Sequence, residues 1–248
     1  MRPLVFVHGF ACDHTDWRPQ AAHFSADHRI FAPDLRGHGA SPGDPADCSI
    51  ETYGADVAAL LEKNDLRDAL LVGHSMGCRV VLQAWMNARS RVGALALMDG
   101  SWLGSGDPAA AERVAREALA AAGFPAFARG MFNAMFLAPS PLATAIVERA
   151  LRLPEAVGAA LFPRMTRWDA EHTERTLAMV KIPLLVIQST YLNPQRKRVP
   201  LAEGETTPWL DLVRRNAPHA QIAVIAGVGH FPQLEAAERV NRLLSSLV

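Results

Sequence analysis

Short runs of consecutive apolar residues recur along most of the chain. Five of them read LVFV, ALLV, ALALM, LLVI and IAVI, with no polar residue at alternate positions. Strands buried on both faces show this pattern, because helices cover both sides of a parallel sheet. The runs predict six strands, at residues 3–7, 29–32, 69–72, 92–98, 184–187 and 222–225.

Between several of these runs, apolar residues are spaced as on one face of a helix. The spacing predicts helices over residues 50–63, 75–88 and 234–247. Strands that alternate with helices imply right-handed crossovers and a parallel sheet. We therefore predict an α/β fold with a mostly parallel six-stranded sheet and helices on both faces.

Residues 101–180 break this alternation. They contain about four helix-like pieces separated by Gly and Pro, and no convincing strand. We predict an all-helical insertion at 101–180, carried by a core made of residues 1–100 and 181–248.

Composition narrows the range of partners. The 25 basic and 25 acidic residues cancel to a formal net charge of zero, which argues against a nucleic-acid-binding protein. The longest basic run is Arg196-Lys197-Arg198. We interpret it as a solvated loop, with an anion contact as the less favoured alternative.

The three cysteines, Cys12, Cys48 and Cys78, are far apart and show no metal-ligand spacing. We predict a reduced compartment, no metal and no cofactor. No signal peptide and no apolar run of about 20 residues is evident. The expectation is a cytoplasmic protein with a small-molecule substrate and no membrane partner; the oligomeric state is left open.

Polar residues at the carboxyl ends of the strands are the first candidates for chemistry, because ligands bind there in open α/β sheets. The third strand ends in Gly73-His74-Ser75-Met76-Gly77, a G-x-S-x-G pattern between a strand and a helix. Such a turn exposes the Ser hydroxyl as a nucleophile. It also places the Met76 N–H at a helix N-terminus, where it can donate to an oxyanion.

A histidine follows the last strand, in Gly227-Val228-Gly229-His230. A neutral imidazole can remove the proton of a Ser hydroxyl as it attacks, and return it to the leaving group. We predict that His230 is the general base for Ser75. The first strand ends in His8-Gly9-Phe10, and the Phe10 N–H is the predicted second oxyanion donor.

Four segments, HGF, DLRGHGAS, GHSMG and GVGHFPQLEAAERV, resemble the α/β-hydrolase superfamily in order and spacing. The resemblance covers residues 1–100 and 182–248, about two thirds of the chain. It implies the α/β-hydrolase fold, with the helical insertion as a cap. It also implies that Asp34 holds the loop that contains Arg36 to Gly39.

The resemblance further implies an acid that orients the histidine, commonly after the fifth strand of this chain. The loop there has no Asp or Glu before Glu203. Asp99 ends the fourth strand, where some branches of the superfamily carry their acid. We predict Asp99 as the third member of a triad, with Asn193 as a neutral and weaker alternative.

The insertion is rich in aromatic and Met residues. Packing of the cap on the core explains them, and so does a pocket wall over Ser75, because ligand pockets are mostly apolar; both can hold. The candidate pocket residues are Trp102, Phe127, Met131, Phe136 and Trp168.

Three functions compete. The favoured one is a serine hydrolase that cleaves an ester, thioester or related carbonyl bond of a hydrophobic or aromatic substrate through an acyl-enzyme on Ser75. The second is a cofactor-independent dioxygenase in which a His230–Asp99 dyad acts on a hydroxy-quinolone-like heteroaromatic. Such enzymes are similar in the place of the acid and in the Phe-Pro after the final His, but this chain lacks the second His and the Trp of their elbow. The third is a ligand receptor without catalysis.

Overall fold

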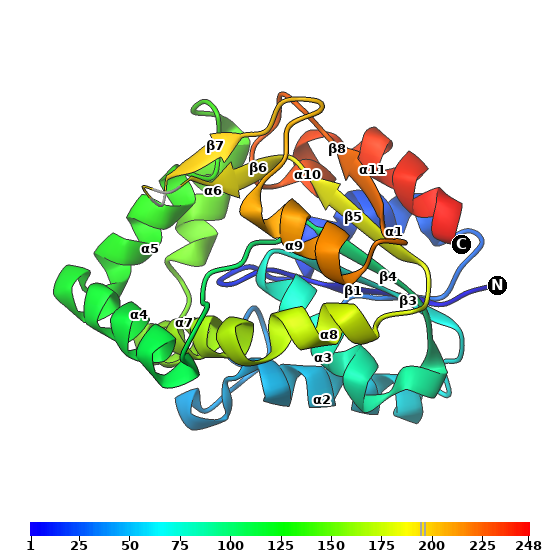
Figure 1. Ribbon diagram of the computed structural model, residues 1–248, viewed down its shortest axis with the longest axis horizontal. Coiled ribbons are helices and arrows are strands. Elements are labelled where there is room, and N and C mark those ends of the chain that lie inside the picture. The colour runs from blue at the N-terminus through cyan, green and yellow to red at the C-terminus, as the bar shows by residue number, and fades with distance from the viewer. Residues whose placement is uncertain (194, 196) are drawn as a thin grey trace.

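A six-stranded sheet forms the centre of the computed structural model, which describes residues 1–193, 195 and 197–248 (Figure 1). Its strands lie in the order β2-β1-β3-β4-β5-β8, and every neighbouring pair is parallel. The predicted parallel sheet is thereby confirmed. The strands are β1 (Leu4–Val7), β2 (Ile30–Phe31), β3 (Ala69–His74), β4 (Val92–Met98), β5 (Leu184–Gln188) and β8 (Gln221–Val224).

Helices cover both faces of this sheet. The core on one face joins alternate strand residues such as Leu4 and Phe6 to α1 (Arg18–Phe24) and α11 (Ala237–Leu244). The core on the other face joins Val5 and Val7 to further helices. These are α2 (Ile50–Lys63), α3 (Met76–Asn87), α8 (Glu174–Met179) and α9 (Pro208–Asn216). Burial of both faces explains why the strand sequences are apolar throughout.

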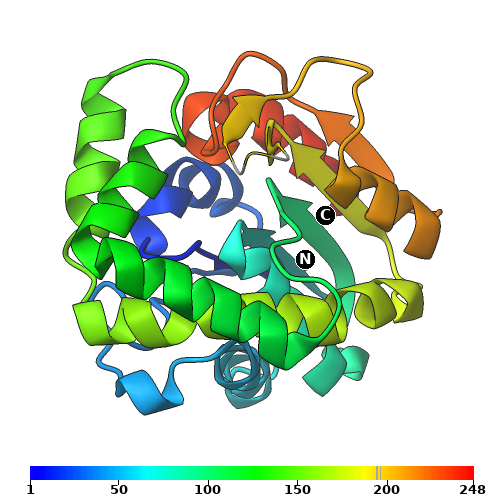
Figure 2. The ribbon, with the colours of Figure 1, turned by 60° about the vertical axis from the view of Figure 1, so that its left-hand side comes forward.

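Between β4 and β5 the described chain forms helices and no strand. Figure 1 shows α4 to α7 gathered at the end of the molecule opposite the two termini, and Figure 2 brings them forward. The segment contains five α-helices where we expected about four. They are α4 (Pro108–Ala122), α5 (Phe124–Asn133), α6 (Pro141–Ala150), α7 (Glu155–Trp168) and α8, with a π-helical turn at Asp169–Thr173 before α8.

Two local predictions were wrong. The loop after β5 contains an antiparallel pair, β6 (Thr190–Leu192) and β7 (Arg198–Pro200), whose strands are too short to leave a hydrophobic pattern. The closing helix is divided into α10 (Pro232–Glu235) and α11, because Ala236 has non-helical dihedrals of φ −140° and ψ 44°. The Glu235 carboxylate bends back to accept hydrogen bonds from the Gly229 and Phe231 N–H groups.

Asp34 holds the following loop, as the resemblance implied: it accepts hydrogen bonds from the Ala40 and His14 N–H groups. Within the described ranges, no helix combines the length and apolar character needed to cross a membrane.

Close backbone contact fixes the start of α3 against β1. A Cβ atom on Gly77 would lie 2.2 Å from the Val7 carbonyl oxygen, and one on Gly73 would lie 2.2 Å from the Gly77 carbonyl oxygen. Both glycines are therefore required by the path of the chain around Ser75.

Gly77→Ala should destabilise the protein by about 1–3 kcal/mol, because the added methyl group overlaps a backbone atom that cannot move alone. Urea unfolding measures the change. The matched control is Gly130→Ala in α5, where an added Cβ meets nothing within 4 Å. That change should stabilise by about 0.5–1 kcal/mol, since Ala restricts the unfolded chain. Equal effects of the two variants would contradict this reading of the Gly77 contact.

Candidate active site

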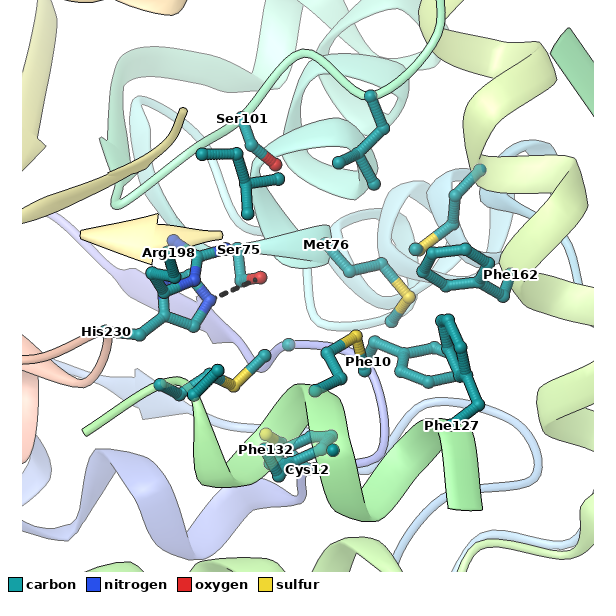
Figure 3. Close-up of a pocket in the computed structure, with 18 of the residues that line it drawn as sticks. Phe10, Cys12, Ser75, Met76, Ser101, Phe127, Phe132, Phe162, Arg198 and His230 are labelled. Atoms are coloured by element: carbon teal, nitrogen blue, oxygen red, sulfur yellow. Dashed lines mark hydrogen bonds between the residues drawn. The ribbon is translucent and has the colours of Figure 1, made fainter. Parts of the chain in front are cut away.

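Three side chains from different strand ends meet above the sheet. His230 Nε2 lies 2.9 Å from Ser75 Oγ, and His230 Nδ1 lies 2.5 Å from Asp99 Oδ2 (Figure 3). Ser75 follows β3, Asp99 follows β4 and His230 lies in the loop after β8. The structure thus brings together the three residues predicted as a nucleophile, an acid and a base.

Ser75 stands on a sharp turn. Its backbone has φ 54° and ψ −113°, a conformation that residues other than Gly rarely adopt. Its N–H donates to the Met98 carbonyl at 2.9 Å, which ties the turn to the end of the adjacent strand. The glycines on either side give the turn room, so its conformational strain is held by the surrounding backbone.

Asp99 is completely buried and also has a positive φ, of 45°. Its Oδ1 accepts from the backbone N–H groups of Ser189 at 2.7 Å and Thr190 at 2.8 Å, and its Oδ2 accepts from the Thr190 hydroxyl at 2.5 Å. Burial alone would raise the pKa of this carboxyl, but the hydrogen bond from His230 and the neighbouring cation lower it to about 2. The carboxylate is therefore ionised at neutral pH.

The chain after β5 contains no Asp or Glu before Glu203, but its Ser189 and Thr190 N–H groups donate hydrogen bonds to Asp99. Asn193, the alternative third member, makes no hydrogen bond to His230 among the described residues: its Oδ1 accepts from the backbone N–H groups of Gln195 and Lys197 at 3.0 and 2.9 Å. It shapes the β6–β7 turn, so the geometry favours Asp99.

The prediction of a solvated basic loop was wrong for Arg198. Its side chain is only 9% exposed, and its Nη1 lies 3.4 Å from Asp99 Oδ2 and 2.7 Å from Thr190 Oγ1. Pairing of β7 with β6 turns this side chain inward, which the sequence pattern did not show. Lys197 is exposed, and Arg196 lies outside the described residues.

His230 is held in its neutral form. Burial and the positive charge of Arg198 lower its pKa to about 4, although the hydrogen bond with Asp99 acts in the opposite direction. With Nδ1–H donating to Asp99, the unprotonated Nε2 faces the Ser75 hydroxyl. An imidazole in this tautomer can accept the hydroxyl proton.

His74 is a part of the site that we did not single out. Its buried ring lies 2.6 Å from the His230 carbonyl oxygen through Nε2, and the two imidazole centroids are 4.8 Å apart. Burial lowers the pKa of His74 well below its usual value, so this ring is neutral and Nε2–H donates. It fixes the loop that carries His230. The residue before Ser75 is unspecified in the G-x-S-x-G pattern, so no sequence motif pointed to His74.

The two predicted oxyanion donors lie beside the nucleophile. A Cβ on Gly9 would lie 3.3 Å from the Ser75 Cβ, so the loop that carries Phe10 passes close to Ser75. Phe10 and Met76 both line the cavity that contains Ser75. Neither of their backbone N–H groups donates to a protein acceptor within the described residues.

A cavity of about 830 Å³ opens above Ser75. Four of the five candidate pocket residues line it: Trp102, Phe127, Met131 and Phe136. Trp168 does not, so that prediction was wrong. It is fully buried at the end of α7, where its indole N–H donates to the Gln83 side chain at 2.9 Å, on the α3 side of the helix.

A buried ion pair joins α3 to the helical segment at 101–180. Arg79 donates through Nε and Nη2 to Asp169 at 2.8 and 2.5 Å, and through Nη2 to the Ser101 carbonyl at 2.8 Å. Asp169 also accepts from the Leu103 N–H at 2.8 Å. These contacts fix the wall of the cavity. No group of three His, Cys, Asp or Glu residues in the described part of the chain is arranged to hold a metal.

Comparison with known proteins agrees with this geometry. The model of the alpha/beta hydrolase family matches residues 4–243. The chain belongs to the alpha/beta hydrolase family. Within this family it is similar to the esterase of Thermogutta terrifontis, with 25% sequence identity, a TM-score of 0.78, and 99% of this chain and 89% of that chain covered.

Two curated relatives are similar in sequence. The dihydrolipoyllysine-residue acetyltransferase component of the acetoin cleaving system of Pseudomonas putida is 28% identical over 97% of this alpha/beta hydrolase and 61% of its own length. A non-heme chloroperoxidase of Streptomyces lividans is 46% identical over 30% of this chain and 28% of its own. The chain thus spans about six tenths of the length of the first relative.

His230 should remain neutral at about pH 5.5, where a free imidazole with a pKa of about 6.5 is mostly protonated. Arg198→Met should raise the pKa of His230, because it removes a positive charge that disfavours the imidazolium. Histidine NMR titration measures both effects, and Arg242→Met on the exposed face of α11 is the control. If Arg198→Met leaves the titration unchanged, the electrostatic role of Arg198 is wrong.

Proposed function

We propose that this protein is a serine hydrolase that cleaves an ester, thioester or related carbonyl bond of a small substrate with a hydrophobic or aromatic part. The observation that carries the proposal is the position of His230, 2.9 Å from Ser75 Oγ and 2.5 Å from Asp99 Oδ2. The family match and the whole-chain likeness to an esterase support hydrolysis as the reaction class.

The reaction begins when His230 Nε2 takes the proton of Ser75 as Oγ attacks the substrate carbonyl. The new negative charge forms on the carbonyl oxygen, which the Phe10 and Met76 N–H groups stabilise. Asp99 stabilises the imidazolium and keeps its Nδ1–H oriented. Collapse of the tetrahedral intermediate passes the proton from His230 to the leaving group and leaves an acyl group on Ser75.

Hydrolysis of the acyl-enzyme repeats these roles. Water attacks the acyl carbonyl while His230 accepts its proton, and the proton returns to Ser75 Oγ as the acid product leaves. His230 must be neutral at the start of both acylation and deacylation. Its lowered pKa keeps the imidazole unprotonated at neutral pH.

We also propose that residues 101–180 act as a cap on a core made of 1–100 and 181–248. Met135 supports this: it lines the cavity, and its carbonyl accepts from the His230 N–H at 2.7 Å. The cap therefore contacts both the apolar space for the substrate and the loop of the base.

A fluorophosphonate probe should label Ser75 in the wild type and fail to label Ser75→Ala. Hydrolysis of p-nitrophenyl esters of graded acyl length should disappear in the same variant, since the nucleophile is lost. The matched control is Ser101→Ala, a second serine that lines the cavity. Oxygen uptake with 3-hydroxy-4-quinolones that survives Ser75→Ala would favour the dioxygenase. Tight binding of a small lactone with no turnover would favour a receptor.

Asp99→Asn should lower kcat on these esters by about 10³–10⁴-fold, because it removes the charge that supports the imidazolium and the preferred tautomer. Steady-state kinetics measures the change, with circular dichroism to confirm folding. Asn193→Ala is the comparison and should retain most activity. The opposite ranking of the two variants would show that the acid is assigned wrongly.

A further inference from the structure

The cavity above Ser75 has two chemically different ends. Figure 3 shows Arg198 and His230 together at one end, beside Ser75, and Phe127 and Phe162 at the other. The rings of Phe127 and Phe162 pack edge to face with centroids 4.7 Å apart, and Phe10 packs against Phe162 at 5.7 Å. A substrate that spans the cavity therefore meets aromatic carbon on one side of the nucleophile and polar groups on the other.

The charges that face this cavity have one sign. Arg79, Lys197 and Arg198 line it, whereas no Asp or Glu among the described residues does. Asp99 and Asp169, the carboxylates that pair with Arg198 and Arg79, do not line the cavity, and their side chains are 0% and 1% exposed. A ligand in the cavity can therefore contact the cationic side chains directly, whereas the carboxylates do not face it.

The three cationic side chains differ in how many of their donor groups bind acceptors in the protein. Arg79 is occupied, because Asp169 binds its Nε and Nη2 and a backbone carbonyl binds Nη2 again. Lys197 is exposed at the rim and has no ion-pair partner in the described part of the chain.

Arg198 is buried but only partly used. Its Nη1 makes both of its contacts, to Thr190 and Asp99, and its Nε and Nη2 donate to no acceptor among the described residues. The 3.4 Å contact to Asp99 is long, and that carboxylate already accepts from His230, Ser189 and Thr190. A guanidinium whose side chain is only 9% exposed and that has two donor groups without a protein acceptor in the described residues is suited to bind a planar carboxylate.

We propose that the substrate carries a carboxylate beside the bond that is cleaved, bound by Arg198 with Lys197 at the rim, and an apolar or aromatic group held near Phe127 and Phe162. The substrate class is thus an anionic ester or lactone of amphiphilic shape. The inference rests on the proposed hydrolase function for the reaction, and on the lining of the cavity for the anion.

The electrostatics of the site agree. Besides burial, the positive charges of Arg198 and Arg79 both lower the pKa of His230, whereas Asp99 raises it. Burial lowers the pKa of Arg198, which means that its charge lacks full solvation. A bound anion compensates for that loss, and it should also raise the pKa of His230.

Binding to the Ser75→Ala protein tests the anion site without turnover. Isothermal titration calorimetry compares 4-phenylbutanoate with 4-phenylbutanamide, which has the same shape and no charge. We expect the carboxylate to bind at least about 10-fold more tightly, the range for a charged hydrogen-bonded partner. If the Ser75→Ala protein, with Arg198 intact, binds both compounds equally or binds neither, the inference is overturned.

Arg198→Gln in the same background should reduce the preference for the carboxylate to less than about threefold, while Arg242→Gln on α11 should leave it intact. Arg198→Lys should retain part of it, because it keeps the charge and loses the fork. A preference that survives in Arg198→Gln overturns the assignment. If circular dichroism shows that Arg198→Gln is unfolded, Arg198→Lys and Lys197→Gln provide the comparison. The assignment is overturned if both of these variants prefer the carboxylate over the amide as strongly as the parent protein does.

Kinetics separates this inference from the proposed function. The two substrates are the mono-p-nitrophenyl ester of glutaric acid and p-nitrophenyl pentanoate. Wild-type kcat/KM should favour the anionic ester, and Arg198→Gln should lower the ratio of the two values by about 10- to 100-fold. Ser75-dependent hydrolysis without an anionic preference defeats the inference and leaves the hydrolase. Carboxylate binding without hydrolysis of either ester defeats the hydrolase and leaves the anion site.

Discussion

The arrangement of the site depends on one buried negative charge. Asp99 has no exposed surface, and an unpaired carboxylate in such a place would cost several kcal/mol. It is stabilised by donors from three separate segments: Ser189 and Thr190 after β5, Arg198 on β7, and His230 after β8. The turn after β5 and the short β6–β7 pair therefore hold the side chain of Asp99, which follows a different strand, β4.

The same charge sets the properties of its neighbours. Its hydrogen bond fixes the Nδ1–H tautomer of His230, and this leaves Nε2 free to face Ser75. Burial and the positive charge of Arg198 together outweigh the effect of Asp99 on the pKa of His230, so the imidazole is neutral at neutral pH. Under the two proposals, the same guanidinium affects the pKa of the base and binds the carboxylate of the substrate, so catalysis and recognition are linked through Asp99.

Buried ion pairs also locate the helical segment over the sheet. Arg79 and Asp169 join α3 to the π-helical turn, and Arg149 on α6 forms ion pairs with Asp13 and Asp16 at the start of the chain. Such pairs contribute little net stability, because desolvation of the charges offsets their attraction. Their geometry restricts how α3 and α6 can pack, so they define the position of the cavity walls relative to Ser75.

Much of the fold could be read from local pattern. The six strands, their parallel pairing and the helical segment at 101–180 follow from runs of apolar residues and from punctuation by Gly and Pro. Ser75 and His230 could be found because each lies at the carboxyl end of a strand, where a parallel sheet brings such residues to one edge. The resemblance to the α/β-hydrolase superfamily implied an acid, and Asp99 was predicted because some branches carry it at this strand end and the loop after β5 has no Asp or Glu before Glu203.

The remaining features depend on contacts between segments distant in sequence. Arg198 belongs to a basic run that resembles a solvated loop, and only the pairing of β7 with β6 turns it toward Asp99, 99 positions away. His74 donates to a carbonyl 156 positions away. Trp168 donates to Gln83 on α3, although the aromatic content of the insertion made it a candidate for the pocket. Periodicity determines which face of an element is apolar. The direction and partner of a buried polar side chain are decided only when the elements pack.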